Sequence, residues 1–340
     1  MSAPCPLLPP ALKIGDTIGF FSASAPATVS ENHRFNRAQD YLRAKGFNLQ
    51  AGILTGKSDF YRSGSILARA EELNRLIRDP NVNCIMSTIG GYNSNSLLPY
   101  IDYSALQANP KIIIGYSDST ALLLGIYART GLITFYGPAL IPSFGEFPPL
   151  VDETYNNLAA ILIEQPPLPY SYPLPSYWSD ERINWNDQQP IRPKTLYNNN
   201  CQFIGSNSVS GRVIGGNLNT LSGIWGSVYM PEIMAGDIIF IEDSLKDIAT
   251  VERSFAMLAL NGIFDRVAAI ILGKHEGFDD AGSGRTPYDV LKEVLGTKTL
   301  PIVNGFDCCH THPMLTLPLG CQIMIDFDCQ QVSLIAPYLK

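Results

Sequence analysis

Residues 111 to 131 read KIIIGYSDSTALLLGIYARTG, and this stretch decides the fold. Its apolar run predicts a buried strand over Lys111–Gly115, because continuous apolar runs are typical of strands covered on both faces. Gly115 permits a tight turn, and the leucine-rich segment that follows predicts a helix. A strand, a turn carrying Ser117 and a helix form the pattern of a nucleophile elbow. The alternative is that Ser117 or Ser119 only caps the helix.

The first 145 residues alternate short apolar segments with amphipathic ones. Strands are expected at Thr17–Phe21, Phe47–Ala51, Asn83–Thr88, Lys111–Gly115 and Leu132–Tyr136. Helices are expected between them, among others at Asn32–Lys45 and Ile66–Arg78. This alternation predicts an α/β domain with a doubly wound parallel sheet. Ligands of such sheets bind beyond the carboxyl ends of the strands, so the loops at 22–27, 90–96 and 115–119 should gather at one edge.

The remaining chain divides into two further parts. Residues 146–205 are rich in proline and aromatic residues and lack periodicity, which predicts a long connection or lid between domains. Residues 206–340 are expected to form a second domain with a helix at about Ile248–Asn261. Its strands are expected at Arg212–Gly215, Asp237–Glu242, Val267–Leu272, Gln322–Asp326 and Gln331–Ile335.

The composition excludes several classes of protein. The chain has 340 residues, of which 46% are hydrophobic, and a formal net charge of −7. A general nucleic-acid binder needs a basic surface, so this class is not expected. No run approaches the roughly 20 apolar residues of a membrane span, and the first residues do not resemble a signal peptide. Seven scattered cysteines favour reduced thiols, and we therefore expect a cytoplasmic protein without a membrane partner.

A serine nucleophile needs a histidine base, and the chain has four histidines, at positions 33, 275, 310 and 312. His310 and His312 lie in GFDCCHTHPMLTLPLG, a stretch dense in turn residues. An alternative is a metal site made of these two histidines with Cys308 and Cys309. Four donors within five residues do not close easily on one ion, so no metal is expected.

The base in turn needs a carboxylate that orients it. AGDIIFIEDS reads as an apolar strand ending in Glu242 and Asp243, which is a suitable place for this acid. Glu276 and Asp279, after a later strand, are competing candidates. The alternative for Glu242 and Asp243 is an ordinary strand end whose acids face water.

A glycine pair follows another buried strand, in STIGGYNSNSLLPY. Gly90 and Gly91 let backbone amides approach a ligand closely, which suits an oxyanion hole. The N–H of Asp118, at the start of the helix after Ser117, is the second expected donor. A plain turn at the glycines is the alternative.

Taken together, these motifs resemble the serine LD-carboxypeptidase family of peptidases with a Ser–Glu–His triad. The matching segments run through nearly the whole chain in the family's order. They include GDTIGFFSASAP, STIGGYNSNSLLPYIDY, IIIGYSDSTALL, TFYGPAL, GRVIGGNLNTLSGIWGS, DIIFIEDS, AAIILGKHE and HTHPMLTLPLG. The resemblance implies that Ser117 is the nucleophile, Glu242 the orienting acid and His310 the base. It also implies a flavodoxin-like sheet with helices on both faces, a smaller mostly β C-terminal domain, a homodimer and no cofactor.

Within the family, FYGPALIPSFGE, SDERINWN and GFDCCHTHPMLTLPLG resemble the branch that gives self-immunity to microcin C. This implies a small-molecule substrate, an aminoacyl or peptidyl nucleotide, cleaved at the amide between the aminoacyl carboxyl and the nucleotide part. Muramoyl-tetrapeptide carboxypeptidases typically have arginine before the glycine pair, where this chain has Ile89. Cell-wall tetrapeptide cleavage remains the alternative activity, and adenylate sequestration without cleavage is the alternative of another class.

Three residues are expected to contact the substrate. By the resemblance, Trp185 in RINWND stacks on the nucleobase, although a lid aromatic that packs on its own domain is the alternative. Lys246 follows Glu242 closely and is a candidate cation for a phosphate or carboxylate. Asn219, in the family-like GRVIGGNLNTLSGIWGS, is the third expected contact.

Overall fold

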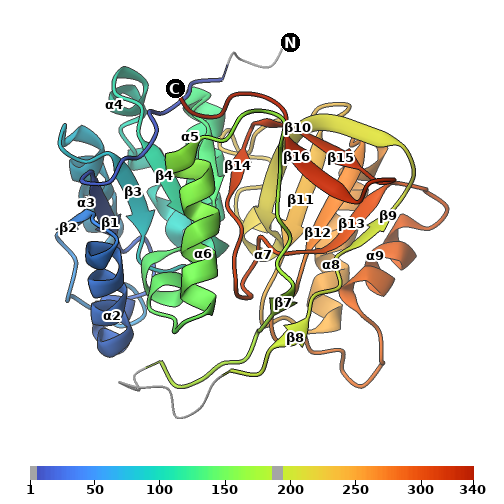
Figure 1. Cartoon of the computed structure of the whole chain (residues 1–340), viewed down its shortest axis with the longest axis horizontal. Helices are drawn as coiled ribbons and strands as arrows, with labels where there is room; N and C mark the ends of the chain where they lie inside the picture. The colour runs from blue at the N-terminus through green and yellow to red at the C-terminus, as the bar shows by residue number, and fades with distance from the viewer. Residues whose placement is uncertain (1–5, 186–193) are drawn as a thin grey trace.

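The computed structural model describes residues 6–185 and 194–340. Two β-sheets lie side by side, and most of the helices pack around them (Figure 1). The prediction of an α/β N-terminal part followed by a mostly β part is confirmed.

The first sheet has the flavodoxin strand order β2-β1-β3-β4-β5, all parallel. All residues of β3 and β4 are buried, because helices and loops cover both faces of the sheet. A sixth strand, β14, joins its edge from far along the chain. The strands are β1 (Thr17–Phe21), β2 (Asn48–Ala51), β3 (Cys84–Ser87), β4 (Ile112–Gly115), β5 (Thr134–Tyr136) and β14 (Leu317–Leu319).

Local signals set the limits of the helices in this half. Ser65 caps α3 by accepting a hydrogen bond from the Ala68 N–H, and α5 ends at Gly131, which adopts a left-handed conformation. The α-helices are α1 (Ala27–Ser30), α2 (Asn32–Ala44), α3 (Ile66–Arg78), α4 (Tyr103–Ala108), α5 (Thr120–Thr130) and α6 (Leu150–Ala159). Shorter helical turns are η1 (Ser94–Tyr100), η2 (Ser117–Ser119), η3 (Leu140–Phe144) and η4 (Ala160–Glu164).

The second sheet has eight strands in the order β6-β16-β15-β10-β11-β12-β13-β9. Its centre, β10 to β13, is parallel, whereas its outer strands are antiparallel. The strands are β6 (Tyr170–Ser171), β9 (Gln202–Ile204), β10 (Ser208–Asn217), β11 (Ile238–Glu242), β12 (Ala269–Gly273), β13 (Ile302–Phe306), β15 (Gln322–Asp326) and β16 (Gln331–Leu334). Helices α7 (Leu218–Ser222), α8 (Ile248–Leu260) and α9 (Pro287–Leu295), and the turn η5 (Ile263–Asp265), connect them.

Two segments join the halves. The connection after α6 carries β6 and a small two-stranded sheet of β7 (Tyr177–Trp178) and β8 (Tyr197–Asn198). The other is β14, which pairs antiparallel with β5, with Leu317 opposite Tyr136. The sequence did not predict β14, because it is three residues long and contains a proline.

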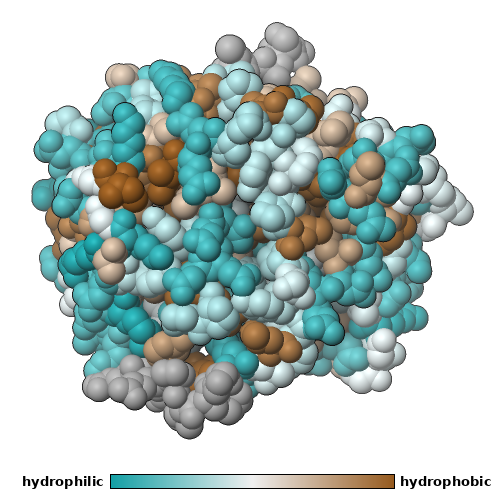
Figure 2. Space-filling model, in the orientation of Figure 1, coloured by the Kyte–Doolittle hydropathy of each residue, from teal (hydrophilic) through white to brown (hydrophobic). Residues whose placement is uncertain are grey.

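One face of the molecule is largely polar (Figure 2). On the face shown in Figure 2, hydrophilic side chains cover most of the area and apolar side chains form small separate groups. None of the helices within residues 6–185 and 194–340 is long and apolar enough to cross a membrane.

Candidate active site

Ser117 lies at the sharp turn that the sequence predicts between β4 and α5. Its φ of 60° is left-handed, which is rare for a residue with a side chain and is typical of a strained functional turn. Gly115 is required just before it, because a Cβ there would lie 2.4 Å from the Ser87 Oγ. Ser117 lines a cavity of about 250 Å³ at the carboxyl edge of the first sheet.

Glu242 and His310 come from the second lobe, and His310 lines the same cavity. Glu242 is the last residue of β11 and is fully buried, and His310 lies in the loop after β13. The Glu242 Oε2 and His310 Nδ1 atoms are 2.6 Å apart. The His310 ring packs edge-on against Tyr116, with 4.8 Å between ring centroids. The imidazole is therefore held by a carboxylate on one side and by an aromatic ring next to Ser117 on the other.

The two sheets are also linked through Tyr136, at the end of β5. The Ser117 N–H donates to the Tyr136 hydroxyl oxygen at 3.1 Å, and this hydroxyl donates to Glu242 Oε1 at 2.5 Å. Asn217 donates to the same Oε1 at 3.0 Å. Glu242 thus accepts from three side chains, which fixes its position between the lobes.

Glu242 and His310 each stabilise the charged form of the other. Burial by itself raises the pKa of Glu242, but His310, Tyr136 and Asn217 overcome this and hold the pKa below its usual value. Burial by itself lowers the pKa of His310, but Glu242, with Glu276 beyond it, overcomes this and raises the pKa above the ordinary value. The carboxylate is therefore ionised beside an imidazole that takes up a proton readily.

The glycine pair lies directly beside Ser117. A Cβ at Gly90 would come within 2.7 Å of the Ser117 Oγ and 3.2 Å of the Asp118 backbone N. Gly91 has a φ of 148°, and a Cβ on it would lie 2.3 Å from the Ser24 Oγ. A side chain at Gly90 would therefore collide with Ser117, and one at Gly91 would collide with Ser24. Two glycines let the loop lie this close to the elbow, which suits an oxyanion hole.

The Asp118 side chain fixes this loop to the elbow. Its Oδ2 accepts from the backbone N–H groups of Asn93 at 3.1 Å and Ser94 at 2.9 Å. The Ser94 hydroxyl donates back to the Asp118 carbonyl at 2.6 Å. The carboxylate is buried and directed toward the loop, where it fixes the backbone of Asn93 and Ser94.

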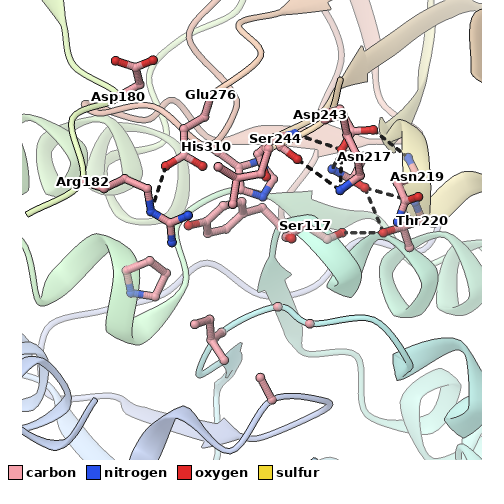
Figure 3. Close-up of a pocket in the computed structure, with 18 of the residues that line it drawn as sticks. Ser117, Asp180, Arg182, Asn217, Asn219, Thr220, Asp243, Ser244, Glu276 and His310 are labelled. Atoms are coloured by element: carbon pink, nitrogen blue, oxygen red, sulfur yellow. Dashed lines mark hydrogen bonds and ion pairs between the residues drawn. The ribbon is translucent and has the colours of Figure 1, made fainter. Parts of the chain in front are cut away.

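A polar rim surrounds the cavity. Figure 3 shows His310 and Glu276 to one side of Ser117, and Asn219 and Asp243 to the other. The Asn219 N–H donates to Asp243 Oδ2 at 3.1 Å. Burial, followed by the charge of Glu242, raises the pKa of Asp243 to about 6. Glu276 is paired with Arg182 at 3.9 Å.

Trp185 and Lys246 also line the cavity, as predicted for substrate contacts. Lys246 lies 4.0 Å from Asp243 and donates to the Ser244 carbonyl at 3.2 Å. Trp185 belongs to the connecting segment and is partly buried. Six of the eight residues expected at the site therefore line one opening. The other two are buried: Glu242 is hydrogen-bonded to His310, and Asp118 follows Ser117 in the chain.

Comparison with known proteins shows the family to which this chain belongs. Residues 18–137 match the LD-carboxypeptidase N-terminal domain, and residues 210–325 match the LD-carboxypeptidase C-terminal domain. The chain belongs to the LD-carboxypeptidase family. Membership of this family identifies the chain as a serine carboxypeptidase, as the sequence resemblance implied.

The relatives of this LD-carboxypeptidase include a microcin C7 self-immunity protein, MccF, from Escherichia coli. The two chains are 65% identical over 335 residues, which is 98% of this chain and 97% of the relative. A structure of MccF without ligand superposes with a TM-score of 0.98 and covers 98% of this chain and 100% of that chain. Another MccF structure, with the same identity and coverage, contains aspartyl sulfamoyl adenosine. A murein tetrapeptide carboxypeptidase of Pseudomonas aeruginosa is 28% identical over 73% of this chain and 74% of its own.

The cysteine and histidine side chains near the active site of this LD-carboxypeptidase point to separate partners. The Cys308 Sγ faces the Tyr136 carbonyl at 3.4 Å, and the Cys309 Sγ faces the Thr311 hydroxyl at 3.1 Å. His312 lies at the cavity wall, where burial lowers the pKa of its imidazole to about 3. In the part of the chain that the structure describes, no three metal-ligating side chains form a group.

Sequence reasoning missed Tyr136 and Asn217. Tyr136 ends a strand in TFYGPAL and Asn217 ends another in GRVIGGN, so both lie at strand ends next to the catalytic loops. Position at a strand end was therefore the signal that could have found them.

Proposed function

We propose that the chain is an amidohydrolase that inactivates microcin C-type aminoacyl or peptidyl nucleotides. The bond cleaved is the amide between the aminoacyl carboxyl and the nucleotide part. The observation that carries the proposal is the Glu242–His310 pair beside the Ser117 elbow, in a cavity that Trp185 also lines. The 65% identity to the microcin C7 self-immunity protein supports this substrate class.

In the proposed mechanism, Ser117 is the nucleophile and His310 its general base. His310 takes the Ser117 proton as the oxygen attacks the amide carbonyl, and Glu242 stabilises the imidazolium that forms. The N–H groups of Gly91 and Asp118 bind the oxyanion. His310 then protonates the leaving nitrogen, and a water molecule hydrolyses the acyl-enzyme. The protein groups supply each proton transfer, so no cofactor is invoked.

The substrate contacts follow from the walls of the cavity. Trp185 is the proposed stacking surface for the nucleobase, and Lys246 and Asn219 the proposed polar contacts of the aminoacyl part. MccF has been solved with adenosine monophosphate in a variant with one tryptophan replaced by phenylalanine. It has also been solved as an active-site variant with a serine, an asparagine and a lysine replaced by alanine. The cavity of this chain is lined by residues of these four types, among them Trp185, Ser117, Asn219 and Lys246.

The decisive experiment offers the protein two substrates in parallel, aspartyl sulfamoyl adenosine and a murein tetrapeptide, with products identified by mass spectrometry. We expect aspartate and sulfamoyl adenosine over many turnovers, and no products from the Ser117→Ala variant, which should still bind the adenosine compound. Faster release from the tetrapeptide would favour the cell-wall activity instead. Binding without multiple turnovers would favour sequestration. Full hydrolysis by Ser117→Ala would refute the role of Ser117.

Three wider features are proposed with this function. We infer a homodimer, which sedimentation analysis of the purified chain would test. We also infer a cytoplasmic location, which cell fractionation would test. The division into residues 1–145, 146–205 and 206–340 remains our proposed domain organisation, and limited proteolysis would test it.

A further inference from the structure

Arg34, near the start of α2, is a charged side chain that is almost completely buried, with 2% of its surface exposed. Its guanidinium donates to the Ile141 carbonyl at 3.0 Å, to the Pro142 carbonyl at 2.5 Å and to Glu146 Oε2 at 2.7 Å. Gly145 makes room for the side chain, because a Cβ there would lie 2.3 Å from the Arg34 Cγ. Three acceptors in different directions fix the plane of the guanidinium.

The indole of Trp185 lies against this fixed guanidinium. The Arg34 Cζ is 4.5 Å from the Trp185 ring centroid, whereas the exposed Arg182 is 5.9 Å away. A cation this close to an indole face is attracted by the π-electrons, and the attraction is stronger where water is excluded. Residues 180–185 form no helix or strand, so the contact with Arg34 is an important support for the Trp185 ring.

Glu146, the partner of Arg34, also holds the connecting segment at a second residue, Lys194. The Lys194 Nζ donates to the Glu146 Oε2 at 2.7 Å, the oxygen that also accepts from Arg34. The Glu146 pKa is about 2: burial opposes the charged carboxylate, but Arg34, His312 and Lys194 outweigh it. Trp185 and Lys194 are thus both held to α2 and the chain after η3, outside their own segment.

We propose that Arg34 is a positioning residue for nucleotide recognition, holding the Trp185 indole ready to stack on the base before the substrate arrives. This rests on the proposed function, in which Trp185 binds the nucleobase. A side chain that is already ordered loses less conformational entropy on binding, so affinity for the base improves without a new contact to it. Part of the affinity for the base therefore depends on Arg34 in helix α2 of the first lobe.

The test is a double-mutant cycle of Arg34→Met and Trp185→Ala. Steady-state kinetics are measured with aspartyl sulfamoyl adenosine and with an aspartyl sulfamoyl compound that has no nucleobase. We expect Arg34→Met to raise KM about 5-fold for the adenosine compound only, with kcat unchanged. In the Trp185→Ala background the same change should have no further effect, because the residue through which Arg34 acts is gone.

Arg37, one turn later on α2, offers a matched control. Its guanidinium lies 4.0 Å from the Phe147 ring centroid and donates to the Gly145 carbonyl at 2.7 Å. Arg37→Met therefore removes a similar cation–π contact near the same loop. It should leave the KM ratio of the two substrates unchanged.

The outcomes separate this inference from the proposed function. An equal KM increase for both substrates, or an undiminished effect of Arg34→Met in the Trp185→Ala background, would overturn the positioning role. If Trp185→Ala itself leaves the adenosine compound unaffected, the proposed base stacking fails instead. Should Arg34→Met not fold, as judged by circular dichroism, Arg34→Lys provides the same cycle. It keeps a charge for Glu146 but loses the planar group under the indole.

Discussion

The two walls of the cavity are built in different ways. On the catalytic wall, Ser117 follows a strand of one sheet, and Glu242 ends a strand of the other, where it accepts three hydrogen bonds from side chains. On the proposed recognition wall, Trp185 ends a stretch, residues 180–185, that forms no helix or strand, and its ring is supported by Arg34. In the proposed function, the chemistry therefore lies at the edges of two sheets, whereas base recognition lies on a segment held by the buried Arg34–Glu146 pair.

This difference gives the two walls different kinetic signatures. A change in a rigid hydrogen-bonded network should lower kcat for every substrate, because it acts on the transition state. A change in the recognition wall should raise KM for nucleotides alone. Single substitutions can therefore separate effects on kcat from effects on KM.

The largest effect is expected from Glu242→Gln. The amide keeps the size of the side chain but cannot stabilise the imidazolium of His310, so kcat should fall by about 10⁴-fold for all substrates. Single-turnover assays with both an adenosine compound and a tetrapeptide would measure it. A fall confined to one substrate would contradict the division between the walls.

A smaller loss of kcat is expected from Asp118→Ala. Without the carboxylate, the N–H groups of Asn93 and Ser94 lose their acceptor and the loop with Gly91 is free to move away. We expect kcat to fall about 100-fold, as when an oxyanion donor is lost, with KM little changed. Asp118→Asn retains an acceptor oxygen and should recover most of the activity. Equal losses in the two variants would show that the acceptor role is not what matters.

On the recognition wall, Trp185→Ala should raise KM for the adenosine compound about 10-fold, since stacking on a base is worth about 1–3 kcal/mol. The tetrapeptide should be turned over at an unchanged rate, whatever that rate is. Trp225→Ala is a suitable control, because Trp225 is also partly buried but lines a different pocket. A change in kcat for both substrates would place Trp185 on the catalytic wall.

The smallest effect concerns pH. Glu242, Glu276 and Asp243 each raise the pKa of His310, with Glu242 contributing most. The base works only when neutral, so activity should appear as the pH rises through this raised pKa. Glu276→Gln removes one negative charge and should lower the pKa, which moves the acid limb of the kcat/KM profile to lower pH. An acid limb that moves to higher pH, or not at all, would show that Glu276 does not act on His310.

The residues of the proposed catalytic wall carry clearer sequence signals than those of the proposed recognition wall, for a physical reason. Ser117, Glu242 and Gly91 each follow a strong apolar run, and parallel strands bring such ends to one edge. Arg34 gave no such signal, because a charged residue in an amphipathic helix reads as part of a solvated face. Its partner Glu146 is more than a hundred residues away, and only the folded chain brings the two together.

Other parts of the fold were missed because their patterns are weak. Helix α9 starts at Pro287 under a capping box at Thr286, but it is short and follows a glycine-rich stretch. Strand β13 contains Asn304 and Gly305, which lower its apparent strand propensity. Both elements depend on the neighbours against which they pack in the second sheet.

The pairing of β14 with β5 has a consequence for biosynthesis. Leu317–Leu319 is synthesised long after β5, yet it completes the sheet whose other strands were made first. Until then the nascent first lobe exposes the unpaired edge of β5, a template for pairing with another chain. The lobe that carries Ser117 is therefore finished only after β6 to β13 have been made, and a product that terminates before β14 would expose that edge permanently.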